Sequence, residues 1–362
     1  MSQENIQDII ALGSDEGNMF DILKNFPDQV KEALKIAGNI PGFNAEIRSN
    51  NFAVLGMGGS AIGGDLLASY SAALPGADHI NILINRTYNL PAYINKDYNV
   101  IASSYSGNTE ETISGFKQAV ERGANIISLT TGGELAELSE ENNLPKITVP
   151  AGLQPRCAIA YSFFPILYTV MNSGAFKQEA INTTEKAIEE LIQKLDKKSK
   201  IYTIPDETKN PALMIAKKLI GTIPVVYSSS ERMNIVNLRW RGQFQENSKT
   251  MAFGNLLPEM NHNEINSWNY PTGMPEKMSL IFIRDVDDHP RIKIRFDAVE
   301  EILEPKSAKI ISVISDGQYL LTRMFDMIYL GDWVSYWLAL LNGADPTPIP
   351  DIMTLKAKLS SE

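Results

Sequence analysis

Apolar residues along this chain gather into short runs that alternate with longer amphipathic segments. In the first half, apolar runs predict strands at 52–55, 79–84, 100–103, 125–129 and 146–149. Helical patterns fall at 3–38 with a break near Phe26-Pro27, and at 65–73, 110–122, 134–141, 159–173 and 175–197. Because strands and helices alternate, this half predicts a parallel sheet covered by helices on both faces.

The same alternation returns in the second half, with little sequence similarity to the first. Strands are predicted at 223–227, 278–283 and 309–313, and helices at 212–220, 229–241, 291–303, 320–341 and 351–359. We therefore expect an α/β protein with two domains, each a parallel sheet flanked by helices. The N-terminal domain is expected over residues 1–180 and the C-terminal domain over residues 200–362.

Two loops of the first half concentrate glycine and hydroxyl residues where a helix is expected to begin. The first is VLGMGGSAIGGD at Val54–Asp65, and the second is ASSYSGNTEET at Ala102–Thr112. Backbone N–H groups and the helix dipole favour an anion at a helix N-terminus, and hydroxyls add hydrogen-bond donors. The two loops therefore predict one phosphate held from two sides. The residues expected to hold it are Gly58, Gly59, Ser60, Ser104, Ser106 and Thr109.

Other interpretations of these loops fit the sequence less well. A dinucleotide fold needs an acidic residue at the end of the next strand, but that strand ends at Ile84-Asn85-Arg86. No Lys-Ser/Thr pair follows the glycines, which excludes a P-loop. Helix capping needs one hydroxyl, whereas the second loop offers those of Ser104, Ser106 and Thr109. The matching loop of the second half, Arg284–His289, carries three carboxylates that would repel phosphate. The anion site is therefore expected in the first half.

Charge and composition exclude some classes of protein. The chain has 33 basic and 43 acidic residues, a net charge of −10, which argues against nucleic-acid binding. The most apolar stretch, Tyr319–Leu341, contains Arg323, Asp326 and Asp332, so no membrane span is expected. The lone Cys157 suits a reducing compartment, and the polar N-terminus shows no signal peptide, so we expect a cytoplasmic protein.

Both loops resemble those of the sugar isomerase (SIS) domain. The second half adds segments at Trp240–Lys249 (WRGQFQENSK), Leu257–Asn263 (LPEMNHN), 345–348 (DPTP) and 355–356 (LK). These are similar to segments of the bifunctional phosphoglucose/phosphomannose isomerases, in the order that this family has. The loops specify only the SIS domain, whereas the second-half segments specify the isomerase. The chain is longer than compact members of the family, and its extra residues have no role that the resemblance explains.

The resemblance implies that fructose 6-phosphate is interconverted with glucose 6-phosphate and mannose 6-phosphate. This aldose–ketose isomerisation requires a base near C1 and C2, groups that open the sugar ring, and positive charge near the enediolate. By resemblance, Glu246 is the base, His262 and Lys356 open the ring, and Arg156 faces the enediolate. Thr347 would leave room at C2 for both epimers.

The resemblance also implies a homodimer in which His262 is contributed across the interface. No cofactor is expected, and no metal, because His79, His262 and His289 lack ligand spacing. Two alternatives stay open: a regulator that binds a sugar phosphate without chemistry, and an SIS isomerase that acts on an amino sugar phosphate. A regulator would keep the hydroxyl loops but would not need Glu246, His262 and Lys356.

Overall fold

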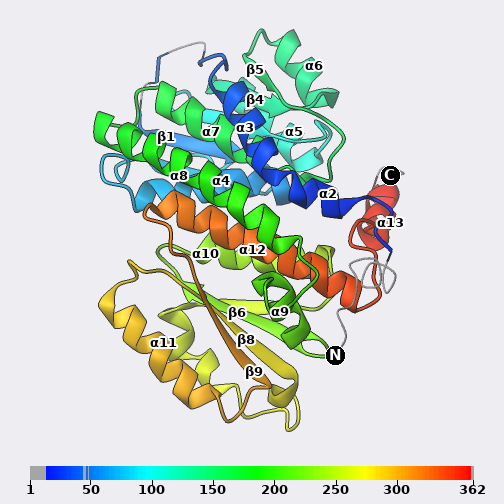
Figure 1. Cartoon of the computed structure of the whole chain (residues 1–362). Helices are drawn as coiled ribbons and strands as arrows, with labels where there is room; N and C mark the ends of the chain where they lie inside the picture. The colour runs from blue at the N-terminus through cyan, green and yellow to red at the C-terminus, as the bar shows by residue number, and fades with distance from the viewer. Residues whose placement is uncertain (1–13, 44–45, 48, 360–362) are drawn as a thin grey trace. The chain divides into compact units, whose positions relative to one another are not determined.

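The computed structural model describes residues 14–43, 46–47 and 49–359, and each of its two compact units contains one parallel sheet (Figure 1). The N-sheet unit comprises Phe26–Ile192 and Gln318–Thr322. The C-sheet unit comprises Gln193–Gly317 with the described parts of residues 1–25 and 323–362. The chain changes unit after Asn25 and Gly317, and also inside two long helices, α8 (Gln178–Tyr202) and α12 (Leu320–Leu341).

The N-sheet unit contains a five-stranded sheet in the order β2-β1-β3-β4-β5, in which all neighbouring strands are parallel. All five strands predicted for the first half are present, with small shifts at their ends. Their bounds are β1 (Asn51–Leu55), β2 (Asn81–Asn85), β3 (Asn99–Ser103), β4 (Asn125–Thr130) and β5 (Lys146–Thr148).

Helices cover both faces of this sheet, which explains why its central strands are almost wholly apolar. On one face, Ala53 and Leu55 pack with Phe116 and Leu135. On the other face, Val54 lies against Gly64. The helices of this unit are α3 (Phe26–Ala37), α4 (Gly58–Ala72), α5 (Glu110–Glu121), α6 (Gly133–Glu141), α7 (Ile159–Asn172) and the first part of α8.

Helix α4 begins at Gly58, so the prediction of a loop up to Asp65 was wrong. Close packing explains why the glycine-rich run is helical. A Cβ atom at Gly59 would lie 2.4 Å from the carbonyl oxygen of Pro155, and one at Gly63 would lie 2.5 Å from that of Ser162. Glycines one helical turn apart therefore let neighbouring backbone approach α4 closely.

The C-sheet unit contains a four-stranded parallel sheet in the order β7-β6-β8-β9. The strands are β6 (Ile223–Ser229), β7 (Phe253–Leu257), β8 (Met278–Arg284) and β9 (Lys309–Ile314). Tyr227 and Phe282 of this sheet pack against Phe296 of α11 (Pro290–Leu303). The other helices of this unit are α2 (Met19–Lys24), α9 (Pro211–Leu219), α10 (Asn234–Glu246), α13 (Pro350–Leu359), the last part of α8 and most of α12.

Two sequence predictions for this unit were wrong. Strand β7 was not predicted, and its glycine explains why. A Cβ atom at Gly254 would lie 2.3 Å from the carbonyl oxygen of Val226, so close strand packing requires glycine where a strand residue is usually branched. The helix predicted from Ser229 begins at Asn234, because Ser229 ends β6 and pairs with Leu257.

Two other features of the helices bear on the predictions. The helix predicted over residues 3–38 is described only from residue 14. From there the chain forms α2 and α3, and the earlier part of the prediction lies outside the described residues.

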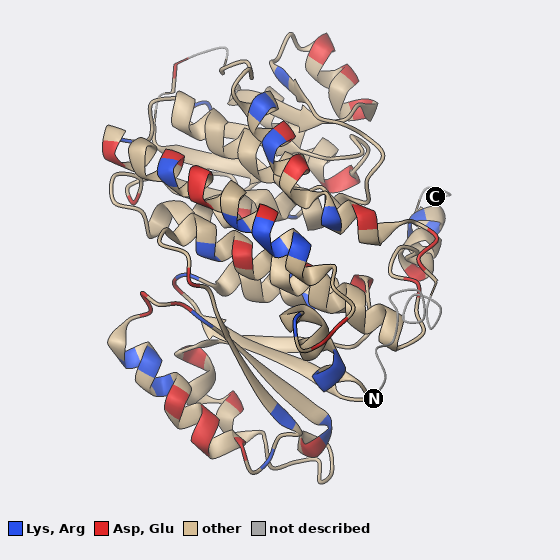
Figure 2. Ribbon diagram, in the orientation of Figure 1, with Lys and Arg blue, Asp and Glu red and all other residues tan. Residues whose placement is uncertain are grey.

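Along α8 and α11, Lys and Arg alternate with or adjoin Asp and Glu (Figure 2). Among the helices of the described residues, none combines the length and the apolar character that crossing a membrane requires.

Candidate functional site

The two predicted anion loops lie in the N-sheet unit at the carboxyl ends of β1 and β3, and hydrogen bonds fasten them together. Ser60, in the first turn of α4, is buried, and its Oγ accepts a 2.9 Å bond from the backbone N–H of Tyr105 in the second loop. Ser103 Oγ donates a 3.1 Å bond to the Ser60 carbonyl oxygen. No side chain caps α4, and Gly58 adopts a left-handed φ of +48°. The start of α4 is therefore held beside the second loop.

The second loop arranges its hydroxyl groups in a fixed cluster. Ser104 Oγ lies 2.9 Å from Thr109 Oγ1 and accepts a 3.1 Å bond from the Gly107 N–H. Ser106 Oγ accepts a 3.3 Å bond from the Asn108 N–H. Thr109 precedes α5, but its side chain makes no capping bond to that helix. Helix capping therefore does not account for the Thr109 hydroxyl, which instead joins Ser104 in the cluster.

A third segment carries Arg156 to the same edge of the sheet. Arg156 lies in the short helix η1 (Pro155–Cys157), which approaches α4 where Gly59 leaves room for it. The Tyr105 hydroxyl donates a 2.7 Å bond to the carbonyl oxygen of Pro150 and accepts a 3.2 Å bond from the Leu153 N–H. Tyr105 thus ties the second loop to the connection that leads into η1.

Sequence reasoning missed the role of Tyr105, although an aromatic residue between two serines of a polar loop was a usable signal. Burial raises the pKa of the Tyr105 hydroxyl, so this group is neutral at pH 7 and acts as donor and acceptor. Arg156 is only 4% exposed. A buried guanidinium beside glycine and hydroxyl loops gives this edge of the sheet the donors that an anionic ligand needs.

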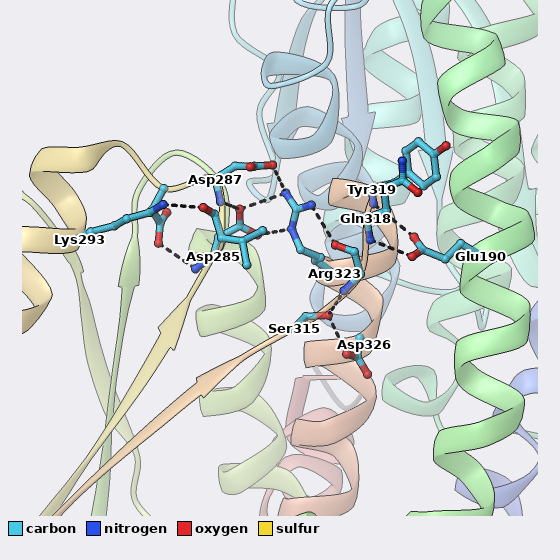
Figure 3. Close-up of polar contacts among 12 residues, drawn as sticks. Glu190, Asp285, Asp287, Lys293, Ser315, Gln318, Tyr319, Arg323 and Asp326 are labelled. Carbon is cyan, nitrogen blue, oxygen red and sulfur yellow. Dashed lines mark hydrogen bonds and ion pairs between the residues drawn. The ribbon is translucent and has the colours of Figure 1, made fainter.

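The corresponding edge of the C-sheet unit has the opposite chemistry, and Figure 3 shows how Arg323 pairs with two carboxylates of its acidic loop. Arg323 of α12 donates to both carboxylate oxygens of Asp285, at 2.7 and 3.1 Å, and to Asp287 at 2.6 Å. Arg323 is 1% exposed and Asp285 is 2% exposed. Burial alone would lower the pKa of the Arg323 guanidinium, but the two carboxylates raise it overall. This acidic loop therefore holds a cation of its own chain.

Glu246 is the last residue of α10, and α12 holds that helix through buried polar contacts. Arg239 donates to both oxygens of Asp332, at 3.1 and 2.8 Å, and Gln243 donates to Asp332 at 2.8 Å. The Trp240 indole N–H donates a 2.7 Å bond to the Met327 carbonyl oxygen. Burial raises the pKa of Asp332, while Arg239 acts in the opposite direction. These contacts fix the axis of α10 and thereby the position of its last residue.

The chain just after Glu246 is held to the segment that contains Thr347. The Lys249 ammonium donates to the carbonyl oxygens of Glu246 at 2.6 Å, Asn247 at 3.2 Å and Pro346 at 3.2 Å. A cation at the C-terminus of a helix also complements its dipole. The Glu246 side chain is half-buried. The proposed base and the Thr347 segment therefore share one ammonium group.

The remaining predicted residues lie at the surface of the C-sheet unit. His262 ends the short helix η2 (Glu259–His262), and Lys356 lies on α13; both are exposed. Glu246, His262, Thr347 and Lys356 thus all belong to the C-sheet unit, whereas Arg156 and the hydroxyl loops belong to the N-sheet unit. Within the part of the chain that the structure describes, no three His, Cys, Asp or Glu side chains are grouped to hold a metal ion.

Two parallel α/β sheets flanked by helices, with glycine and hydroxyl loops at the carboxyl edge of one of them, are the architecture of the SIS class. A solved C-terminal domain of glucosamine-fructose-6-phosphate aminotransferase from Francisella tularensis shares this fold, with a TM-score of 0.71 at 10% identity over 91% of this chain and 98% of that one. Residues 208–359 match the family model described as the bacterial phospho-glucose isomerase C-terminal SIS domain.

Sequence relatives identify the family within that class. The bifunctional phosphoglucose/phosphomannose isomerase of Caldicellulosiruptor bescii is 39% identical over 94% of this chain and 99% of its own. The chain belongs to the bifunctional phosphoglucose/phosphomannose isomerase family. A D-glucosamine-6-phosphate 4-epimerase of Sulfolobus acidocaldarius is also related, at 30% identity over 66% of this chain and 69% of its own.

Proposed function

We propose that the protein is an aldose–ketose isomerase that interconverts fructose 6-phosphate with glucose 6-phosphate and mannose 6-phosphate. The observation that carries this proposal is the similarity to the Caldicellulosiruptor bescii isomerase, which spans 94% of this chain and 99% of that one. The hydroxyl cluster of the N-sheet unit gives independent support, because it suits a phosphate group that takes no part in the chemistry.

In this proposal the hydroxyl loops bind the substrate and other residues carry out the reaction. Ser60, Ser104, Ser106 and Thr109, with Gly58 and Gly59, bind the phosphate. His262 and Lys356 open the sugar ring. Glu246 then takes a proton from C2 of the open-chain aldose and returns it to C1, which yields the ketose through an enediolate. The Arg156 guanidinium stabilises the negative charge that forms on the enediolate oxygens. Thr347 leaves space at C2 for both epimers.

We further propose that the active enzyme is a homodimer in which His262 serves the partner's site. The exposure of His262 at the end of η2 supports this, because the imidazole is accessible to a second copy. Mixing inactive Glu246→Gln subunits with inactive His262→Ala subunits tests it. Restored activity is expected, because a mixed dimer contains one site with both groups intact. An unchanged, inactive mixture would favour a site built within one chain.

The domain division at residues 180–200 and a cytoplasmic location are parts of the same proposal. The lone cysteine, Cys157, is buried and suits a reducing compartment. The division lies within α8, where the main segment of the N-sheet unit ends at Ile192 and the long middle segment of the C-sheet unit begins at Gln193. Separate expression of the predicted domains would test whether each folds alone.

One relative favours a second candidate, an enzyme that acts on an amino sugar phosphate. That relative is named D-glucosamine-6-phosphate 4-epimerase. Two parallel reactions decide between the two candidates. In one, the protein is incubated with fructose 6-phosphate, and glucose 6-phosphate and mannose 6-phosphate are measured separately. In the other, it is incubated with glucosamine 6-phosphate. Formation of both aldoses supports our proposal. Turnover of glucosamine 6-phosphate alone favours the second candidate, and binding without any turnover favours a regulator.

A further inference from the structure

The first described residues of the chain, 14–25, cluster with the C-sheet unit. The Asp15 carboxylate anchors them, because it accepts bonds from the N–H groups of Met19 at 2.7 Å and Phe20 at 2.9 Å and so fixes the start of α2. The Tyr336 hydroxyl of α12 donates to the same carboxylate at 3.2 Å. Burial and the Asp15 charge both raise the pKa of Tyr336, which keeps this donor protonated. The segment is therefore held firmly on α12.

One carboxylate joins this segment to the turn that contains Thr347. Asp345 Oδ2 accepts bonds from Ser14 Oγ at 3.2 Å and from the Glu16 N–H at 3.3 Å. Asp345 Oδ1 accepts a 2.8 Å bond from the Thr347 N–H. Movement of residues 14–16 is therefore transmitted to the backbone at Thr347.

Gly17 packs directly on the Thr347 side chain. A Cβ atom at Gly17 would lie 2.3 Å from Thr347 Oγ1 and 2.6 Å from its Cβ. Gly17 does not adopt a left-handed φ, so packing rather than backbone conformation requires a glycine here. Threonine is branched at Cβ and rotates little, so its side chain cannot turn away from an added methyl group. Gly17 therefore sets where the Thr347 side chain lies.

The same turn is joined to Glu246. Pro346, between Asp345 and Thr347, accepts a bond from the Lys249 ammonium, and this ammonium also donates to the Glu246 carbonyl oxygen. Lys249 has a left-handed φ of +52°, which turns the chain at the end of α10. A continuous set of contacts thus runs from Gly17 through the 345–347 turn to the residue proposed as the base.

We propose that residues 14–17 are a positioning element that fixes Thr347 relative to Glu246 and so sets the proportions in which the two C2 epimers form. Gly17, Asp345 and Lys249 are positioning residues in this scheme, because they act through Thr347 and Glu246. The proposal rests on the proposed isomerase function.

The main test is Gly17→Ala, with the ratio of mannose 6-phosphate to glucose 6-phosphate formed initially from fructose 6-phosphate as the readout. We expect this ratio to change about threefold or more, since small displacements in a site have large effects on rate. A residue with only a structural role would lower the active fraction and leave the ratio unchanged. The matched control is Gly42→Ala, because a Cβ atom at Gly42 meets nothing within 4 Å.

A double-mutant cycle tests whether Gly17 acts through Thr347. In a Thr347→Ala background, Gly17→Ala should change the product ratio much less than it does in the native chain. Equal changes in both backgrounds, or an unchanged ratio in the native background, would overturn the proposal. If Gly17→Ala does not fold, Ser14→Ala removes one bond to Asp345 and should shift the ratio in the same direction.

A measurement independent of activity separates failure of this inference from failure of the proposed function. Hydrogen exchange of the peptide that contains Thr347 should be faster in Gly17→Ala than in Gly42→Ala, because the added methyl group displaces Thr347 and weakens its N–H bond to Asp345. Faster exchange in a protein that does not isomerise fructose 6-phosphate would support the positioning element and reject the proposed function. Unchanged exchange would reject the positioning element itself.

Discussion

The two sheets of this protein present opposite chemistry at equivalent edges. At the carboxyl edge of the N-sheet, Ser104 and Thr109 hydroxyls lie 2.9 Å apart beside glycines and a buried Arg156. At the carboxyl edge of the C-sheet, Asp285 and Asp287 surround Arg323. Both edges belong to parallel sheets, where ligands usually bind at the carboxyl ends of strands. One edge is therefore suited to an anion, whereas the other is already occupied by a guanidinium of its own chain.

This difference shows how one fold plan serves two purposes. At the C-sheet edge, the ion pairs with Arg323 give the acidic loop a structural role. The residues proposed for chemistry in the C-sheet unit lie elsewhere, at the end of α10, on η2 and on α13. A fold alone does not assign function to a loop, and the side chains at each edge decide it.

The largest effect is expected for Glu246→Gln, which tests whether the C-sheet unit carries the chemistry. The amide cannot accept the proton, so turnover should fall by about 10²–10⁴-fold, the usual contribution of a positioned base. KM for fructose 6-phosphate should change little, because the hydroxyl loops are intact. Glu301→Gln on the exposed surface of α11 is the control. Turnover within a few-fold of the native enzyme would exclude Glu246 as the base.

The second prediction concerns the carboxyl edge of the C-sheet, where Arg323 pairs with the acidic loop. Arg323→Met leaves the Asp285 charge buried without its cation, which should lower the free energy of unfolding by about 3–5 kcal/mol. Urea denaturation measures this loss. Adding Asp285→Asn to Arg323→Met should restore part of the stability, because the unpaired charge is then removed. A loss below about 1 kcal/mol for Arg323→Met would show that the ion pair is not what holds the acidic loop.

The third prediction concerns the carboxyl edge of the N-sheet, where the hydroxyl loops lie. Ser104→Ala removes a buried hydroxyl that bonds Thr109 and Gly107, so KM for the phosphorylated sugar should rise about 10-fold or more while kcat changes less. The control is Ser230→Ala, since Ser230 is exposed in a loop of the C-sheet unit. The comparison between the two edges would fail if both substitutions raised KM equally.

The smallest effect is expected on the pH dependence of stability, for two buried tyrosines chosen one from each unit. Burial raises the pKa of Tyr70 to about 12, although its bond to Thr184 acts in the opposite direction. Tyr70 therefore contributes stability that is complete below pH 10 and is lost as pH rises toward 12. Tyr70→Phe should reduce the loss of stability between pH 9 and 11 by about 1 kcal/mol.

Tyr329 provides the matched case in the C-sheet unit, because burial likewise raises its pKa to about 12. Tyr329→Phe should have a similar effect in urea denaturation at pH 9 and 11. Similar values would show that alkaline sensitivity follows burial and is independent of the loop chemistry. A pH dependence unchanged by either substitution would contradict this explanation.

Sequence patterns predicted the alternation of strands and helices and the hydroxyl loops, because these depend on local residue types. They did not predict β7, since Gly254 is required by the neighbouring backbone at Val226. They did not predict the pairing of Asp285 with Arg323, which are 38 positions apart and on different elements. The sequence predicted that these carboxylates would repel phosphate, but it could not predict their partner, which depends on tertiary structure. The contact of Gly17 with Thr347 could not be predicted for the same reason.

The path of the chain through its two units has a consequence for synthesis on the ribosome. The carbonyl oxygen of Leu23 accepts a bond from the Tyr329 hydroxyl, 306 positions later, and Ser14 meets Asp345 331 positions later. Residues 14–25 therefore cannot make these contacts until nearly the whole chain has been synthesised. The N-sheet unit likewise needs Gln318, whose N–H bonds Glu190, before it is complete. Such high contact order slows folding, so truncated chains of this protein should depend heavily on chaperones.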